Sequence, residues 1–353
     1  MAYTTIKKPS DYFNTVLYTG DGTSSNAITG VGFQPDFLWI KERNNTRGHQ
    51  LMDVVRGASL RLQTSNTNAD SASALNSFDS DGFDVNGSTL NGTNFNTGTY
   101  AAWNWLADNT SGSSNTDGSI TSTVSANTTS GFSIVSYTGN GSGSATVGHG
   151  LGVIPSTVII KARTSGSANG YWYVKHKSLT SNYNIYLNVT DAASNVTSFS
   201  QGGIGDLDNA NTFDFASGTS GVNTVNASGT DFIAYCFAEK QGFSKFGSYT
   251  GNGSTDGTFV YTGFKPAFVM VKRTDTTGNW VMVDSKRDTF NVCDAVVSAD
   301  ISDAEYDVDV EDFLSNGFKM RDAHTTRNAS GGTYIYMAFA EEPLVGDNPA
   351  TAR

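Results

Sequence analysis

The chain has 353 residues, of which 37% are hydrophobic and 12% aromatic, and its formal net charge is −11. The aromatic content argues against a disordered chain, and the acidity without any Lys/Arg-rich run excludes binding to a phosphate backbone or an anionic membrane surface. No apolar stretch is long enough for a transmembrane helix. We therefore expect a folded protein of up to three domains, with no nucleic-acid partner and no membrane insertion.

The N-terminal segment, residues 1–11, has no apolar core and does not read as a signal peptide. Cys236 and Cys293 lie in apolar runs and are predicted to be buried thiols, with no disulfide framework. Abundant Gly, Ser, Thr and Asn nevertheless give the composition of a secreted β-rich adhesin. A virion protein, assembled in a host cytoplasm and released by lysis, would reconcile these features.

One phrase occurs three times along the chain: LYTGDG at 17–22, then SYTGNG at 136–141 and 248–253. A proline, a lysine and a strand-ending aromatic residue follow each copy at similar spacing. They are Pro35, Pro155 and Pro266; Lys41, Lys161 and Lys272; and Trp105, Phe237 and Phe339. Such spacing predicts an internal repeat of domain size, with the phrase itself acting as strand end and turn.

Within each repeat the elements are predicted to be short strands. PDFLWIK, PSTVIIK and PAFVMVK are apolar on both faces, which is typical of a central, buried strand. Asp81-Gly82 and Asn316-Gly317, between apolar flanks, predict two-residue hairpin loops. The expected fold class is all-β, with three tandem antiparallel β-sandwich domains resembling jelly rolls.

The predicted domain boundaries follow the repeat. Residues 12–108, 131–240 and 241–345 form the three β-sandwiches, and residues 346–353 form a C-terminal tail. Residues 109–130 are rich in Ser, Thr, Asn and Gly and are predicted to be a flexible linker, with one weak strand at residues 120–124. The first unit should therefore move freely, whereas the short joint between the second and third should fix their mutual angle.

Acidic residues supply the candidate metal ligands. Asp307, Asp309 and Glu311 alternate along one expected strand face and could bind Ca²⁺, which prefers oxygen ligands. A solvated acidic face is the alternative interpretation. The Asp79, Asp81 and Asp84 cluster is better explained by its hairpin. No spacing indicates zinc, and we expect no cofactor.

Two tryptophans are the candidate glycan contacts. Trp172 and Trp280 occupy matching strand positions and could stack on sugar rings if partly exposed; otherwise they belong to the core. Asp53 with Arg56, and Asp284 with Arg287, are predicted structural ion pairs. No nucleophile motif or marked carboxylate pair appears, so we expect no enzymatic activity.

The chain resembles a family of phage virion proteins, frequent in marine phages, that are described as tail-fibre or uncharacterised structural proteins. The resemblance is carried by GVGFQPDFLWIKERN, SFDSDGFDV, SYTGNGSTDGTFVYTGFKPAFVMVKRTD and FLSNGFKM, among other segments between about residues 12 and 343. It implies a virion structural role and supplies no catalytic residues.

The leading functional hypothesis is a tail fibre or external appendage that attaches to the host surface, with a host glycan as one possible ligand, or to other virion proteins. Repeated modules favour this because weak contacts multiply into avidity. A homo-oligomer, for example a trimer, is expected. The alternatives are a capsid decoration or tail accessory protein with a purely structural role, and a polysaccharide depolymerase.

Overall fold

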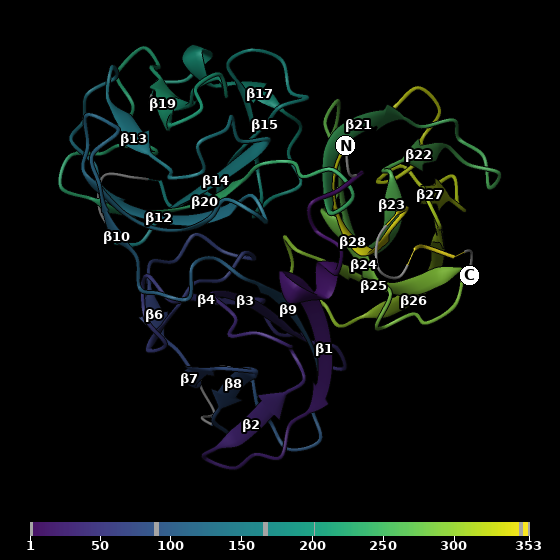
Figure 1. The fold of residues 1–353 in the computed structure, drawn as a ribbon. Coiled ribbons are helices and arrows are strands. Elements are labelled where there is room, and N and C mark those ends of the chain that lie inside the picture. The colour runs from purple at the N-terminus through teal and green to yellow at the C-terminus, as the bar shows by residue number, and fades with distance from the viewer. Residues whose placement is uncertain (1–2, 88–91, 165–168, 201, 346–348, 352–353) are drawn as a thin grey trace.

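Each sequence repeat forms one β-rich lobe, and the three lobes surround a common centre (Figure 1). The computed structural model describes residues 3–87, 92–164, 169–200, 202–345 and 349–351. We call residues 12–108 lobe 1, residues 109–240 lobe 2 and residues 241–345 lobe 3. All pairs of named strands are antiparallel, which confirms the predicted antiparallel all-β class. The exact domain boundaries and the jelly-roll resemblance stay predictions.

A four-stranded sheet is built identically in every lobe. Its strand orders are β1-β9-β3-β4, β12-β20-β14-β15 and β21-β28-β23-β24. The bounds are Phe13–Thr19, Thr99–Trp105, Phe37–Glu42 and Gln50–Asp53 in lobe 1; Phe132–Thr138, Asp231–Phe237, Thr157–Ala162 and Tyr173–His176 in lobe 2; and Ser244–Thr250, Thr333–Pro343, Phe264–Arg273 and Val281–Asp284 in lobe 3. The strand predicted to be central lies between two neighbours each time.

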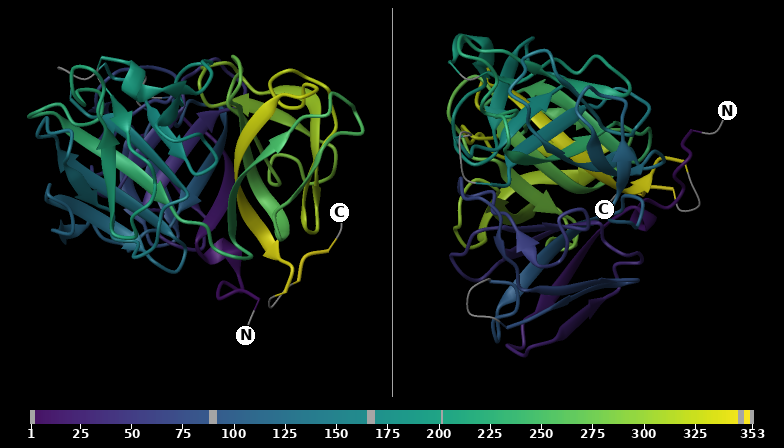
Figure 2. Two further views of the ribbon diagram at one scale, coloured as in Figure 1. Left: turned by 90° about the horizontal axis from the view of Figure 1, so that it is seen from above. Right: turned by 90° about the vertical axis from the view of Figure 1, so that its left-hand side faces the viewer.

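Smaller elements complete lobes 1 and 3. Lobe 1 adds the sheet β2-β8-β7 and the pair β5-β6, whereas in lobe 3 the strands β25, β26, β27 and β22 extend the main sheet until it curls into a nearly closed barrel (Figure 2). A 3₁₀ turn, η1, precedes β1. The bounds are Pro9–Asp11 for η1, then Asn26–Thr29, Gly82–Val85, Leu75–Asp79, Leu60–Arg61, Ser71–Ala72, Cys293–Ser298, Tyr306–Leu314, Gly317–Met320 and Phe259–Tyr261 in the order named.

Lobe 2 begins with the segment predicted to be a flexible linker. The predicted flexibility is wrong, whereas the strand expected at residues 120–124 overlaps β11. Strands β10 (Ser113–Asn115) and β11 (Ser122–Asn127) pair with each other, and β11 pairs with β12. Polar side chains hold the segment: Ser125 Oγ donates to Asp108, and Asn127 Oδ1 accepts from the Ser130 N–H. The rest of lobe 2 is β13 (Thr146–Gly148), β16 (Tyr183–Tyr186), β17 (Ser194–Asn195), η2 (Val196–Ser198), β18 (Gly203–Ile204) and β19 (Thr212–Ala216).

The predicted hairpins form, with their loops one residue earlier than expected. Asp79 pairs with Gly82 across the β7–β8 turn, so the loop residues are Ser80 and Asp81. The glycine is required by close packing instead: a Cβ at Gly82 would lie 1.9 Å from the Ile28 carbonyl oxygen of β2. In the repeated phrase, which was predicted to act as a turn, the second glycine has a positive φ, for example 77° at Gly141.

The central strands are apolar on both faces because each face meets a different core. In β3, Leu38 and Ile40 belong to the core of lobe 1, whereas Phe37 and Trp39 face a second core shared by all three lobes. The same division holds in lobes 2 and 3. The first unit is therefore packed against both others and is not free.

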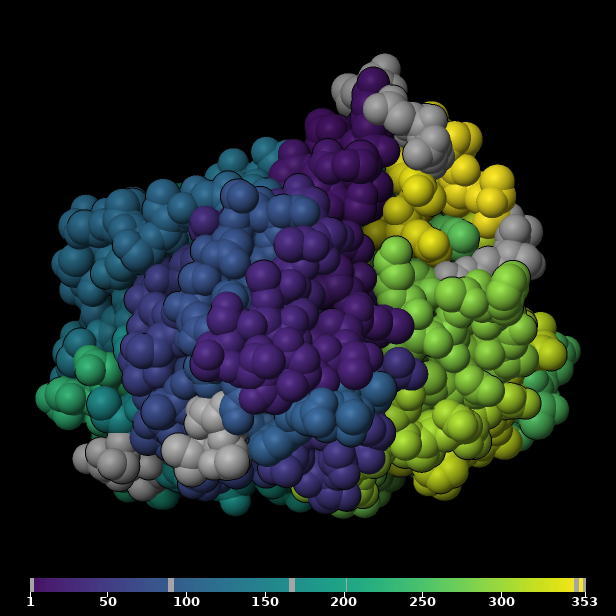
Figure 3. Space-filling view, turned by 90° about the horizontal axis from the view of Figure 1, so that it is seen from below, coloured from purple at the N-terminus to yellow at the C-terminus, as the bar shows by residue number. Residues whose placement is uncertain are grey.

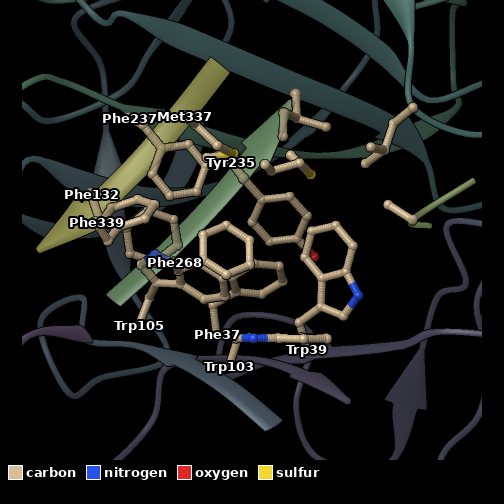
Figure 4. Packing of buried hydrophobic residues seen from close by; sticks show 14 of the residues in the cluster. Phe37, Trp39, Trp103, Trp105, Phe132, Tyr235, Phe237, Phe268, Met337 and Phe339 are labelled. Atoms are coloured by element: carbon tan, nitrogen blue, oxygen red, sulfur yellow. The ribbon is translucent and has the colours of Figure 1, made fainter. Parts of the chain in front are cut away.

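The shared core is rich in aromatic rings (Figure 4). Phe37 of lobe 1 stacks on Tyr235 of lobe 2 at 4.3 Å between ring centroids, and Phe13 stacks on Phe339 of lobe 3 at 5.0 Å. A residual cavity at the centre measures about 10 Å³, no more than a single water needs. Such packing makes each ring a large contributor to stability.

Both ends of the described chain lie at the same end of strand β28. The Tyr3 hydroxyl donates to the carbonyl of Gly263, next to β23, and the Ala350 N–H donates to the carbonyl of Pro343, the last residue of β28. Figure 3 shows the N-terminal segment beside the C-terminal residues on one side of the molecule. The start of β28, at Thr333, lies at the other end of lobe 3.

Candidate functional site

The two tryptophans considered as glycan contacts are buried, so the glycan interpretation is wrong and the alternative, that they belong to the core, is confirmed. Trp172 is 0% exposed and Trp280 is 4% exposed. Each indole N–H donates across a boundary between lobes: Trp172 to the carbonyl of Gln63 at 3.0 Å, and Trp280 to the carbonyl of Tyr186 at 2.8 Å. Buried indoles need such partners, and the function of both residues is to join lobes.

The predicted calcium ligands are not brought together. The pairing of β25 with β26 is irregular: Cys293 pairs with Glu311 and Ala295 pairs with Asp307, so two steps along β25 match four steps along β26. This irregularity interrupts the expected alternation of the acidic residues. Asp307 and Asp309 are exposed. Glu311 is buried, its carboxylate has no hydrogen-bond partner among the described residues, and burial raises its pKa. Within the described ranges, no three His, Cys, Asp or Glu side chains form a group that could hold a metal ion.

The three boundaries between lobes, which we call seams, repeat one set of contacts in cyclic order. His49 takes the position of the two tryptophans in lobe 1, and its Nε2 lies 3.0 Å from the carbonyl oxygen of Ser298 in lobe 3. The matched lysines behave alike: Lys41 donates to Ser302, Lys161 to Thr67, and Lys272 to Thr190, each in the neighbouring lobe. Burial lowers the pKa of all three lysines to about 8.

The predicted ion pairs are confirmed, and they too lie at seams. The Arg56 Nε and Asp53 Oδ2 atoms are 2.6 Å apart and fully buried, and Arg287 and Asp284 match them. Asp53 also accepts the Tyr235 hydroxyl of lobe 2, and Asp284 accepts the Trp103 indole of lobe 1. These pairs are therefore more than surface pairs, because removing one partner would leave a buried charge uncompensated.

A second ion pair closes two of the three seams. Arg43 of lobe 1 contacts Glu305 of lobe 3 at 2.6 Å, and Arg163 of lobe 2 contacts Asp70 of lobe 1 at 2.8 Å. Burial alone would raise the pKa of Glu305, but Arg43 and Arg287 hold it below its usual range. The backbones of each pair are also bonded, from Glu305 N–H to Arg43 and from Asp70 N–H to Arg163.

The third seam keeps the backbone bond but lacks the ion pair. Here the Ala193 N–H of lobe 2 donates to the Thr274 carbonyl of lobe 3 at 3.0 Å. Thr274 and Ala193 thus replace the arginine and the carboxylate. A groove of about 460 Å³ opens at this place, and it is our candidate site. Its lining residues are Ser178, Leu179, Thr180, Tyr183, Ala193, Ser248, Tyr249, Thr250, Thr274, Asp275, Thr333, Tyr334 and Ile335.

Hydroxyl groups cover one wall of the groove. Thr250, Thr333 and Thr274 lie side by side at the ends of β21, β28 and β23, and the Oγ1 atoms of Thr274 and Thr333 are 2.8 Å apart. Beside them, Arg273 donates to both oxygens of Asp275, at 2.8 and 3.0 Å, and lowers the pKa of that carboxyl. Asp275 therefore stays ionised, and its charge is balanced.

The facing wall comes from lobe 2 and is partly apolar, with Leu179, Tyr183 and Ala193. The loop that carries Leu179 and Tyr183 is held in place by a buried lysine. Lys175 is buried and donates to the carbonyls of Thr180 and Tyr183. These bonds fix the loop before any ligand arrives, which favours a preformed site.

Sequence reasoning missed the groove, although one half of its signal was readable. Two positions after the matched lysines stand Arg43, Arg163 and Thr274, so the repeat register marks the exception in lobe 3. The other half, Ala193, lies in a stretch of lobe 2 that does not align with Asp70 or Glu305 by any shared motif. Only the matched backbone bonds reveal that equivalence.

The chain belongs to a family described as a domain of unknown function (DUF7483), whose model matches residues 8–343. That one match spans all three lobes. No curated protein matches the chain. Among the described residues, no helix is long and apolar enough to cross a membrane.

Proposed function

We propose that the protein is a phage virion protein in an external position, such as a tail fibre or appendage, where it attaches to the host surface or to another virion protein. The observation that carries the proposal is the groove of about 460 Å³ between lobes 2 and 3, in a three-lobed body held together by a shared core. Fixed walls on rigid sheets suit recognition, since little order is lost on binding. The sequence resemblance to phage virion proteins supports the setting.

The groove supports binding without hydrolysis. Asp275 is the only carboxylate among its described lining residues, and the Arg273 bonds that lower its pKa disfavour the protonated form a general acid needs. Glycoside hydrolysis ordinarily uses two carboxylates. We therefore propose an attachment protein that is not a depolymerase. An oligomer, such as a trimer, remains part of the proposal and is tested by light scattering after size exclusion.

Localisation tests the proposal directly. Purified particles of a phage whose genome encodes the chain should contain the protein by mass spectrometry, and immunogold should label a tail or other appendage. Purified protein added to host cells should slow adsorption of that phage. Regular labelling over the whole capsid with no effect on adsorption would instead support a decoration protein. Absence from the particle would reject the proposal.

A further inference from the structure

The groove exists because one seam departs from the pattern of the other two. Where Arg163 and Asp70 fill the seam between lobes 1 and 2, the matched Thr274 and Ala193 leave space between lobes 2 and 3. The backbone on both sides stays bonded, at 3.0 Å. The space therefore results from different side chains on a backbone arrangement that all three seams share. A ligand bound there would occupy the place that an ion pair fills in the other two seams.

Charge decides which ligands fit. The ionised carboxylate among the described lining residues, Asp275, is bonded twice to Arg273, and the buried Lys272 donates to the carbonyls of Thr190 and Gly278. The wall thus offers no uncompensated charge to a cation or an anion. A charged ligand would lose hydration without gaining a partner, so a neutral ligand is favoured.

Polarity narrows the class further. Ser178, Thr180, Ser248, Thr250, Thr274 and Thr333 each bring a hydroxyl that can donate and accept. Leu179 and Tyr183 of lobe 2 add apolar surface opposite the four hydroxyls of lobe 3. A ligand with many hydroxyls on its edges and C–H groups on its faces matches both walls. The volume of about 460 Å³ is within the range of small-molecule pockets, roughly 300–1,000 Å³.

We propose that the groove between lobes 2 and 3 binds a short neutral saccharide, with Thr250, Thr274 and Thr333 bonding its hydroxyls and Tyr183 packing against a ring face. This inference rests on the proposed attachment function for its biological setting. It moves the glycan contact away from the buried tryptophans, to a surface that ligands can reach.

Rebuilding the missing ion pair tests the proposal. The double variant Thr274→Arg with Ala193→Asp should fill the groove as Arg163 and Asp70 fill theirs, with the fold retained. The full chain is titrated by calorimetry and saturation-transfer NMR with lactose, maltose, cellobiose and diacetylchitobiose, and with sialyllactose as the charged comparison. We expect at least one neutral sugar to bind, and the double variant to weaken it by about tenfold or more.

A milder variant guards against misfolding. Thr333→Val keeps shape and strand preference but removes the central hydroxyl, and it should weaken binding severalfold. Thr99→Val changes the matched residue of lobe 1, outside the groove, and should leave binding unchanged. The proposal is overturned if no neutral sugar binds, if both groove variants bind like the wild type, or if sialyllactose binds best. The virion labelling experiment is independent of these binding results. The proposed attachment function can therefore hold even if the saccharide proposal is overturned.

Discussion

Asp36 is a buried carboxyl whose protonation affects stability. Its Oδ2 accepts the N–H groups of Ala107 and Asn109, yet burial raises its pKa from 3.8 to about 6. The folded state therefore holds this proton more tightly than the unfolded chain does. The stability that Asp36 contributes is present at low pH and is lost as the pH rises from 3.8 to about 6.

The variant Asp36→Asn removes this titration and keeps an oxygen for the two N–H groups. We expect its free energy of unfolding at pH 7 to exceed that of the wild type by about 1–3 kcal/mol, and the gain to vanish near pH 4. Urea denaturation at both pH values measures this. An equal effect at the two pH values would show that Asp36 does not titrate as described.

The buried histidines act in the opposite direction. Burial lowers the pKa of His49 from 6.5 to about 3 and that of His176 from 6.5 to about 4. The unfolded chain takes up these protons first, so the stability from both neutral rings is complete above pH 6.5 and is lost as the pH falls toward these values. Both rings bond to carbonyls across seams, and acid should therefore loosen the seams.

At two neighbouring core positions, the larger side chain stands at one position in lobe 1 and at the other position in lobe 3. Lobe 1 has Trp39 beside His49, with a hydrogen bond between the rings at 2.8 Å, whereas lobe 3 has Met270 and Trp280. We expect His49→Trp alone to overpack the core and to lower the free energy of unfolding by about 1–3 kcal/mol. The same change removes the acid dependence that the His49 ring contributes below pH 6.5, and adding Trp39→Met should restore most of the lost stability. Thermal melts at pH 7 and 5 check both points, and simple additivity of the two changes would contradict the exchange.

At the scale of elements, strand β11 distinguishes a docked segment from a linker. Its residues 123–127 pair with β12, and Val124 is only 5% exposed. Hydrogen exchange followed by mass spectrometry should find the amides that pair β11 with β12 protected to a similar degree as those between β12 and β20. If the β11 amides exchanged within seconds, the interpretation of this segment as a flexible linker would be supported instead.

How far the sequence predicts these elements depends on what each pattern encodes. The apolar strand around Phe37 was correctly predicted to be central, because a strand buried on both faces must be apolar on both. What covers the second face was not predictable, since apolar burial has no direction. The composition of residues 109–130 was misleading for a related reason: Ser, Thr and Asn suit loops, but they also suit strands whose side chains bond to backbone.

At the scale of the molecule, the shared core should make unfolding cooperative. Phe237 contacts Trp105 of lobe 1 and Phe339 of lobe 3, so Phe237→Ala removes contacts from all three lobes. We expect a loss of about 3–5 kcal/mol and one calorimetric transition, shifted as a whole. Phe83→Ala, in the separate core of lobe 1, should also shift the whole transition. Separate transitions in either variant would show that the lobes unfold independently.

The placement of the chain ends gives the molecule a direction. Tyr3 and Ala350 are bonded near Pro343, where β28 ends, whereas the groove includes Thr333, where β28 begins. Strand β28 has eleven residues, which corresponds to roughly 35 Å at 3.3 Å per residue. A tether joined to either terminus would therefore be proximal, and the groove would be carried at the distal tip, facing away from whatever holds the protein.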